Sequence, residues 1–226
     1  VFRFPRLLIL GLLINYVVVP SIGVGVIKAL NIEPIYAIGL LLVVCTPGGP
    51  MGALLTQKVR GNLALATSLV VVMNVLNTVV TPAMAWFLQI TPQTSDGDIP
   101  VWAMARTIVL FQLAPLCLAL WWRHRWEASA RRWQPRAAQA SNWLIGLTAG
   151  GFMLKEVAKG GAGALLLPTP VLMATFTCVL ASLLVGYALG IGRPEDRSAL
   201  CMTTSVRSMG LALLLAAAWF PDPRSI

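Results

Sequence analysis

The residues of this chain that could do chemistry lie in two stretches where helix-breaking or polar residues interrupt apolar sequence. In the first stretch, Pro47, Gly48, Gly49 and Pro50 stand in the middle of a hydrophobic run. Proline removes a backbone donor and clashes with the preceding turn, and glycine permits backbone conformations that a helix does not use. Four consecutive breakers favour a true helix discontinuity over a proline kink. The freed helix ends would present partial charge to a ligand.

The second stretch places polar residues and an arginine in the first half of another apolar run, at Thr203, Thr204, Ser205, Arg207 and Ser208. An arginine at such a depth is costly and normally faces the protein interior. Its planar guanidinium pairs bidentately with a carboxylate or a phosphate, so this stretch predicts an anion-binding position. The alternative is that the helix begins near Ser208 and that Arg207 extends its side chain to the surface.

Enzymatic chemistry has few candidate residues in this sequence. The single histidine is His124, and there is no HExxH motif, no GxSxG motif and no pair of aspartates on one helix. The four cysteines do not show CxxC spacing, and they are Cys45, Cys117, Cys178 and Cys201. Disulfide and zinc sites therefore have little support. We predict no catalytic residue, no metal site and no cofactor.

The elements that position these stretches are membrane-spanning helices. Of the 226 residues, 58% are hydrophobic and only 11% are charged, whereas soluble domains are about 25% charged. A bilayer core needs roughly 20 consecutive apolar residues per helix, and no run alternates as a barrel strand would. The sequence therefore predicts an all-α integral membrane protein. The seven predicted spans are 7–30, 35–56, 62–88, 101–122, 142–158, 168–191 and 198–220.

The net charge of +9 is distributed as the positive-inside rule requires. Basic residues mark alternate junctions, at Arg3 and Arg6, at Lys58 and Arg60, at five arginines between 123 and 136, and at Arg193 and Arg197. The pattern predicts a cytoplasmic start of the chain, a cytoplasmic loop at 123–140 and an outward-facing loop at 91–99, most simply in a bacterial inner membrane. The basic loop at 123–140 could bind RNA instead, but its charge pattern favours the lipid bilayer as partner, and we predict no nucleic-acid partner.

The sequence resembles the bile acid:sodium symporter family, as a divergent member. The resemblance rests on NYVVVP at Asn15–Pro20, PGG at Pro47–Gly49, GNLALATSL at Gly61–Leu69, TP at Thr81–Pro82 and GLAL at Gly210–Leu213. It implies two inverted five-helix repeats whose fourth and ninth helices are broken and cross near the membrane centre. The chain would then supply the counterparts of helices three to nine, incomplete at both ends, without the first two helices and the tenth.

This comparison divides the chain into three predicted parts. Residues 1–90 would form core helices of the first repeat, including the broken helix 35–56. Residues 91–165 would form panel helices with the 123–140 loop. Residues 166–226 would form core helices of the second repeat, including the broken helix 198–220.

The sodium-binding pattern of the family is largely missing here. A Ser-Asn pair of the family corresponds to Gly52 and Ala53, and a Ser and a Thr of the following helix correspond to Ala66 and Val70. Sodium is a hard cation that needs several oxygen ligands. A sodium site could use only displaced oxygens, namely those of Asn15, Thr67 and Ser68.

In the second broken helix, the family's Glu and Gln correspond to Thr203 and Arg207. The fixed guanidinium of Arg207 would supply the charge that bound sodium otherwise brings. Sodium coupling is therefore doubtful, and a proton is the alternative coupling ion.

We therefore expect a secondary active transporter of small organic anions that works by alternating access. The predicted substrate-binding residues are Asn15, Gly48, Gly49, Thr203, Thr204, Arg207 and Ser208. One alternative is a non-transporting or receptor-like relative, because ligand positions have been lost. Another is a metalloid carrier similar to arsenite efflux proteins, because Cys45 lies beside the predicted break.

Overall fold

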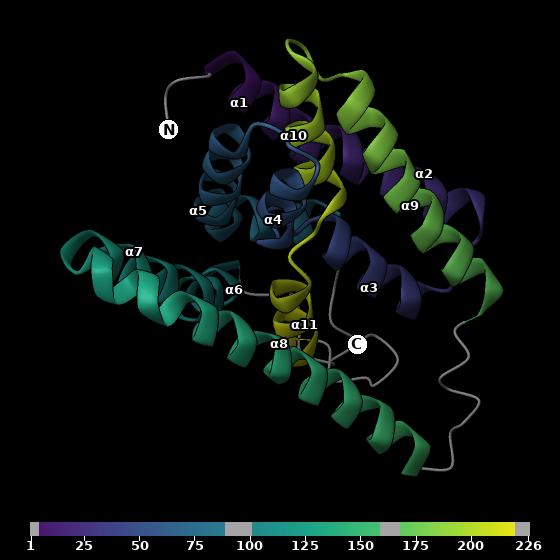
Figure 1. Ribbon diagram of the computed structural model, residues 1–226. Helices are drawn as coiled ribbons and strands as arrows, with labels where there is room; N and C mark the ends of the chain where they lie inside the picture. Colours follow the sequence, from purple (N-terminus) through teal and green to yellow (C-terminus); the bar gives the residue numbers. More distant parts are fainter. Residues whose placement is uncertain (1–4, 89–100, 159–167, 220–226) are drawn as a thin grey trace. The chain divides into compact units, whose positions relative to one another are not determined.

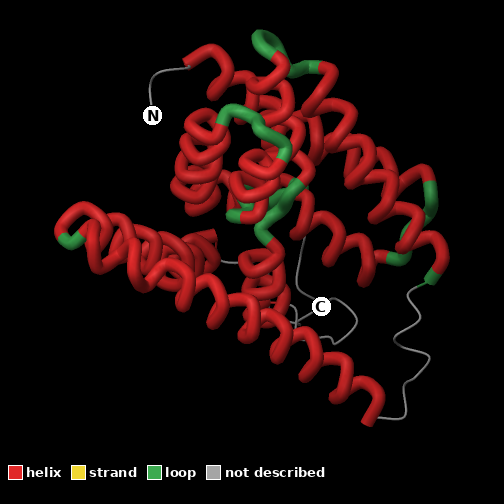
Figure 2. The backbone as a smooth tube through the Cα atoms, viewed as in Figure 1, coloured by secondary structure: helices red, strands yellow, loops and turns green. Residues whose placement is uncertain are grey.

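The computed structural model describes residues 5–88, 101–158 and 168–219, and every element in these ranges is helical (Figures 1 and 2). In order along the chain the elements are α1 (Pro5–Leu13), the π-helix η1 (Ile14–Val18), α2 (Val19–Ala29), α3 (Pro34–Val44), α4 (Met51–Lys58), α5 (Leu63–Phe87), α6 (Val101–Ile108), the π-helix η2 (Val109–Leu113), α7 (Ala114–Arg125), α8 (Glu127–Ala158), α9 (Thr169–Ala188), α10 (Pro194–Ser205) and α11 (Met209–Trp219). The prediction of an all-α membrane protein is confirmed.

Within the described ranges, four helical stretches are long and apolar enough to span a membrane. They are Pro5–Ala29, Leu63–Phe87, Trp102–Arg125 and Thr169–Ala188. Each lies within a few residues of a span predicted from the sequence. The two predicted broken spans appear instead as pairs of shorter helices, α3 with α4 and α10 with α11. The inverted repeats stay a prediction.

The prediction of a loop at 123–140 was wrong. Helix α7 continues to Arg125, and α8 begins at Glu127 after the single residue Trp126. The Trp126 N–H donates to the Trp122 carbonyl at 2.8 Å, so helical hydrogen bonding continues into this joint. Polar residues end a membrane span but do not end a helix, and alanine, arginine, glutamate and glutamine all favour helix. The predicted span 142–158 is the second half of α8. Which side of the membrane this segment faces stays a prediction, and the 91–99 loop lies outside the described residues.

The chain divides into two compact units, residues 1–113 with 173–226 and residues 114–172. The second unit is a helical hairpin made of α7 and α8 and extends into the start of α9. The first unit contains both interrupted helices, and it is the part that carries the candidate site.

Two apolar clusters hold the first unit together, one towards each end of α5. The first joins α5 to α1 and α10 through Leu8, Leu65, Ala66, Leu69, Met73, Ala199 and Leu200. The second joins α5 to α3, α6 and α11 through Leu42, Ala85, Met104, Ile108, Leu211, Leu215 and Ala216. Because lipid is as apolar as leucine, these contacts stabilise the fold through close packing. The two helix interruptions lie between the clusters, beside the middle of α5.

Candidate functional site

The first helix interruption lies where the sequence predicted it. Helix α3 ends at Val44 and α4 begins at Met51, and Gly48 between them has a φ of 91°. The second interruption separates α10 from α11 at Val206–Ser208. Pro47 and Arg207 form an isolated antiparallel bridge, and the Ser208 N–H donates to the Thr46 carbonyl at 2.8 Å. The prediction of two breaks lying next to each other is confirmed, and Figure 1 shows the two broken helices passing one another there.

Glycines let the two interruptions approach this closely. A Cβ added to Gly49 would lie 2.4 Å from the Arg207 carbonyl oxygen, and one added to Gly52 would lie 3.1 Å from the Thr203 Cα. A Cβ at Gly48 would lie 2.9 Å from the Met73 Cβ, on α5. From the sequence, Gly48 and Gly49 were expected to let a ligand approach the backbone. In the structure they instead make room for Met73 and for the backbone of the other interruption.

The carbonyl groups freed at the first interruption are bonded by side chains of α5. The Asn77 amide nitrogen donates to the Pro47 carbonyl at 2.8 Å, and the Thr81 hydroxyl donates to the Cys45 carbonyl at 3.1 Å. Tyr16 orients Asn77 by donating its hydroxyl to the Asn77 Oδ1 at 2.7 Å. Sequence reasoning missed the roles of Tyr16 and Asn77. The available signal was the pair Asn77 and Thr81, polar residues one turn apart inside an apolar span.

Arg207 is the residue whose environment points most directly to a ligand. Its Nη1 and Nη2 atoms are buried and have no hydrogen-bond partner, although the residue as a whole is half-buried. The titratable groups that act electrostatically on it are the thiols of Cys45 and Cys178 and the hydroxyl of Tyr16. Such groups are ordinarily neutral at pH 7, so no carboxylate among the residues that the structure describes is found to balance the guanidinium. The alternative that Arg207 extends to the surface is wrong, because α10 precedes it and the end of its side chain lies inside.

Asn15 lies in the π-helix η1 and is fully buried. Its Nδ2 donates to the Gly11 carbonyl at 2.8 Å and to the Thr204 hydroxyl at 3.2 Å, while its Oδ1 is buried without a partner. Thr204 is three residues from Arg207, and Tyr16, next to Asn15, acts electrostatically on Arg207. The buried unpaired acceptor of Asn15 thus belongs to a residue bonded to Thr204, which is three residues before the buried unpaired donors of Arg207. π-helical turns such as η1 are frequent at functional sites.

The remaining predicted residues divide between this region and other places. The Thr203 hydroxyl donates to the Ala199 carbonyl of its own helix at 2.7 Å, so its proton is used within α10 and only its oxygen could accept from a ligand. Ser208 contributes its backbone N–H to the bridge between the interruptions. Thr67 is exposed and bonds the Leu63 carbonyl at 2.8 Å, and Ser68 beside it is half-buried. The structure does not bring Thr67 to the crossing.

The buried, unpaired guanidinium of Arg207 suits an anion as its ligand. Among the residues that the structure describes, no three His, Cys, Asp or Glu side chains are grouped as metal ligands. The positions corresponding to the family's ion ligands offer little oxygen, since Ala66 and Val70 are buried apolar residues and Gly52 packs against Thr203. What remains is a buried guanidinium with neutral neighbours.

Comparison with known proteins shows the family to which this chain belongs. The model of the sodium bile acid symporter family matches residues 1–150, a range that includes the first interruption. This chain is 39% identical, over 80 residues, to the "Probable sodium/metabolite cotransporter BASS1, chloroplastic" of Arabidopsis thaliana. The match covers 35% of this chain and 20% of that relative. Over 227 residues, 96% of this chain, it is 25% identical to the "Uncharacterized sodium-dependent transporter YocS" of Bacillus subtilis, of which the match covers 66%.

A third relative is the "Probable sodium/metabolite cotransporter BASS2, chloroplastic" of rice, Oryza sativa subsp. japonica. It is 25% identical over 235 residues, which cover 98% of this chain and 52% of the relative. The chain thus spans less than two thirds of each of these relatives. The match to the family model nevertheless extends over more than half of the chain, and the chain belongs to the sodium bile acid symporter family.

Proposed function

We propose that this chain carries the substrate site of a secondary active transporter of small organic anions, and that Arg207 binds the anion. The observation that carries the proposal is the buried guanidinium of Arg207, whose Nη1 and Nη2 lack a partner. An uncompensated buried charge is strongly destabilising, and the usual solution is an opposite charge with good hydrogen-bond geometry. A carboxylate would satisfy both nitrogens bidentately. A single guanidinium among neutral thiols and a phenol matches a monoanion best.

Asn15 would complete the recognition of that anion. Its Oδ1 accepts no hydrogen bond in the structure, whereas its Nδ2 is already used twice. An acceptor in this position suits a solute that carries a hydroxyl or amine donor in addition to its carboxylate. The side chains of Thr204 and Tyr16 hold Asn15 and its surroundings in place through the bonds described above. Asn15 and Arg207 are thus the two proposed contacts with the solute.

Sodium coupling through the family's usual positions is doubtful in this chain. The relatives are described by name as sodium-dependent or as sodium/metabolite cotransporters. Here Gly52, Ala53, Ala66 and Val70 supply no side-chain oxygen where the resemblance places ion ligands. We propose that the guanidinium provides the positive charge instead, with a proton as the alternative coupling ion.

Alternating access requires the two broken helices to move as one body. Two hydrogen bonds between the turn before α5 and the start of α10 support such a joint movement. The Asn62 Nδ2 donates to the Asp196 Oδ1 at 2.7 Å, and the Asn62 N–H donates to the Glu195 carbonyl at 3.0 Å. Together with the hydrogen bond between Thr46 and Ser208, these bonds connect the first broken helix and the start of α5 to the second broken helix at two separate places. Such a unit would shift against its neighbours as a rigid core.

The test is solute binding by the complete gene product, purified in detergent and titrated with a panel of carboxylates in sodium chloride and in N-methylglucamine chloride. We expect Arg207→Gln and Arg207→Lys to weaken binding about tenfold or more, because desolvated charge pairs couple by about 2 kcal/mol or more. The control is Arg197→Gln, which removes an exposed arginine of the same broken helix.

Binding in the wild-type protein should change little between sodium and N-methylglucamine. Strong sodium dependence, or full binding by Arg207→Gln, would contradict the proposal. Binding of a carboxylate that the reconstituted protein does not move across the membrane would favour the receptor-like alternative.

A further inference from the structure

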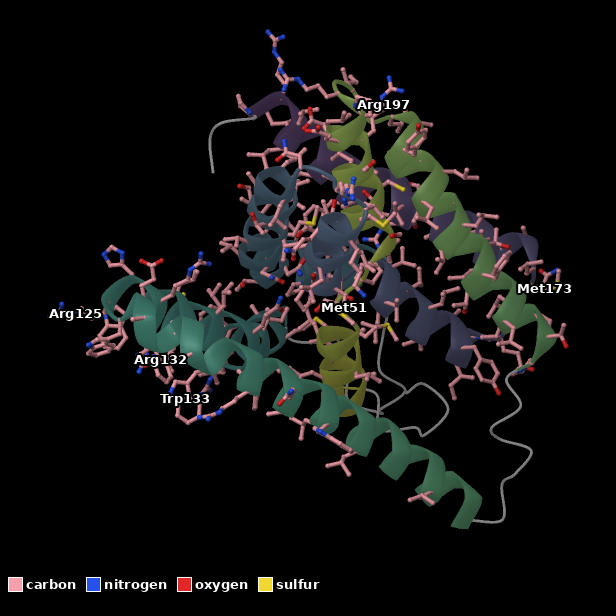
Figure 3. All side chains as sticks on the ribbon, in the orientation of Figure 1. Met51, Arg125, Arg132, Trp133, Met173 and Arg197 are labelled. Carbon is pink, nitrogen blue, oxygen red and sulfur yellow. The ribbon has the colours of Figure 1, made fainter. Side chains whose placement is uncertain are left out.

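The turn between α7 and α8 carries a surface of arginine and tryptophan side chains, which we call the Trp–Arg surface and define as Arg125, Trp126, Arg132, Trp133 and Arg136. The Arg125 guanidinium carbon lies 6.0 Å from the Trp126 ring centroid, and that of Arg136 lies 5.3 Å from the Trp133 ring centroid. Trp126 is 51% exposed and Trp133 is 52% exposed. Figure 3 shows Arg125, Arg132 and Trp133 projecting outward near this turn.

Arg132 and Arg136 have no acidic residue at helical spacing from them in the sequence of α8. Arg132 and Arg136 are four residues apart, so they lie on the same face of α8, where like charges repel. The positions three and four residues to either side of this pair carry no acidic residue. Between Ala114 and Lys155 the sequence contains only one acidic residue, Glu127, which points about 140° and 180° around the helix from Arg132 and Arg136. An anion bound from outside the helix would therefore suit this pair.

The position of the surface along the chain indicates which anion this is. The membrane-length apolar stretch Trp102–Arg125 ends at the first residue of the Trp–Arg surface. A helix that spans the hydrocarbon core places its last residues at the level of the lipid headgroups. Tryptophan favours that layer, and arginines beside it bind anionic headgroups. An RNA ligand would not require the surface to begin where a span ends.

We propose that the Trp–Arg surface binds the phosphate headgroup of an anionic phospholipid. The indoles of Trp126 and Trp133 lie in the interfacial layer, and each holds a guanidinium over its ring. Arg132 and Arg136 donate paired N–H groups to phosphate oxygens, which a lysine could not do with the same planar geometry. The inference is independent of the proposed substrate site, because the Trp–Arg surface and that site share no residue.

Native mass spectrometry of the full chain tests this binding. The protein is purified in mild detergent and offered equal amounts of phosphatidylglycerol and phosphatidylcholine with identical acyl chains. We expect the wild type to retain phosphatidylglycerol preferentially. Arg132→Gln with Arg136→Gln removes both charged groups that hydrogen-bond the phosphate and should reduce that preference at least tenfold. Trp133→Leu removes the stacking partner of Arg136 and should reduce the preference by a smaller factor.

The matched control is Lys58→Gln with Arg197→Gln, which removes the same two charges from exposed positions on other helices. It should leave the preference within about twofold of the wild type. Equal losses in the control and in the Arg132/Arg136 variant would overturn the proposal, since they would indicate diffuse attraction only. So would a wild type without preference for phosphatidylglycerol. Binding of a labelled RNA oligonucleotide through Arg132 and Arg136, not displaced by phosphatidylglycerol, would show instead that the surface recognises nucleic acid.

Discussion

Replacing Gly49 by alanine should destabilise the crossing of the two broken helices more than the same change at an exposed glycine within a helix. In a Gly49→Ala variant, the new Cβ would meet the Arg207 carbonyl oxygen at 2.4 Å, the Arg207 carbonyl carbon at 2.9 Å and a Val206 methyl group at 2.9 Å. Two of these three atoms belong to the backbone and cannot rotate away. The broken helices would therefore have to separate.

The cost follows from two contributions. Overpacking a filled site costs about 1–3 kcal/mol, and contact with backbone should bring this case to the upper end. Separating the interruptions also weakens the bond from the Ser208 N–H to the Thr46 carbonyl, which is worth about 1 kcal/mol net. We therefore expect Gly49→Ala to lower the free energy of unfolding by about 3–4 kcal/mol, which exceeds a hundredfold change in the unfolding equilibrium.

The matched control is Gly25→Ala on α2, where an added Cβ meets nothing within 4 Å. Alanine is favoured over glycine inside a helix, so this control should be neutral or stabilising by about 0.5–1 kcal/mol. Equilibrium unfolding in detergent micelles with increasing dodecyl sulfate, followed by circular dichroism, measures both variants on one scale. If the free energies of unfolding of Gly49→Ala and Gly25→Ala differ by less than about 1 kcal/mol, the close approach at Gly49 is not a feature of the folded protein.

Two further predictions concern the capped carbonyls and the topology. Asn77→Leu should lower the free energy of unfolding by about 1–3 kcal/mol in the same assay, because it leaves the buried Pro47 carbonyl without a donor. The control Thr67→Val changes an exposed hydroxyl that is bonded only to its own helix, so its loss should be much smaller. Equal losses in the two variants would refute the role of Asn77 in bonding the Pro47 carbonyl. In intact cells expressing a cysteine-free background, an impermeant maleimide should label a cysteine placed at Ser95 and spare one placed at Ser129. The reverse pattern would invert the orientation.

The sequence predicted each interruption separately, because breakers and buried polar residues are local signals. Pro47–Pro50 breaks a helix whatever lies beside it. Arg207 in an apolar run required an interior partner or a route to the surface, and only the structure distinguishes the two by burying the guanidinium. The 123–140 segment could not be predicted in the same way. Its polarity indicated the end of a span, whereas its helix propensity decided its backbone conformation.

The site residues that were missed share one physical reason. The side chains of Tyr16, Asn77 and Thr81 form hydrogen bonds with freed peptide groups or with each other. A broken helix in hydrocarbon must have its freed carbonyls bonded by protein, so donors on the neighbouring helix were required by the prediction of a break. Their identity follows from which turn of α5 lies beside Pro47, a fact of tertiary packing that spacing along the chain does not contain.

The same requirement explains why the interruptions must be adjacent. The Thr46 carbonyl, freed by the first break, accepts from the Ser208 N–H, which is freed by the second. Neither group has a partner in its own helix, so each break supplies the bond that the other lacks. A change that closed one break into a continuous helix would leave an unpaired peptide group at the other, at the depth where water is scarce. The unpaired guanidinium of Arg207 sits at this junction. Under the proposed function, an anion bound to Arg207 would stabilise both interruptions together, and the substrate would thereby act directly on the two helices that we propose to move in alternating access.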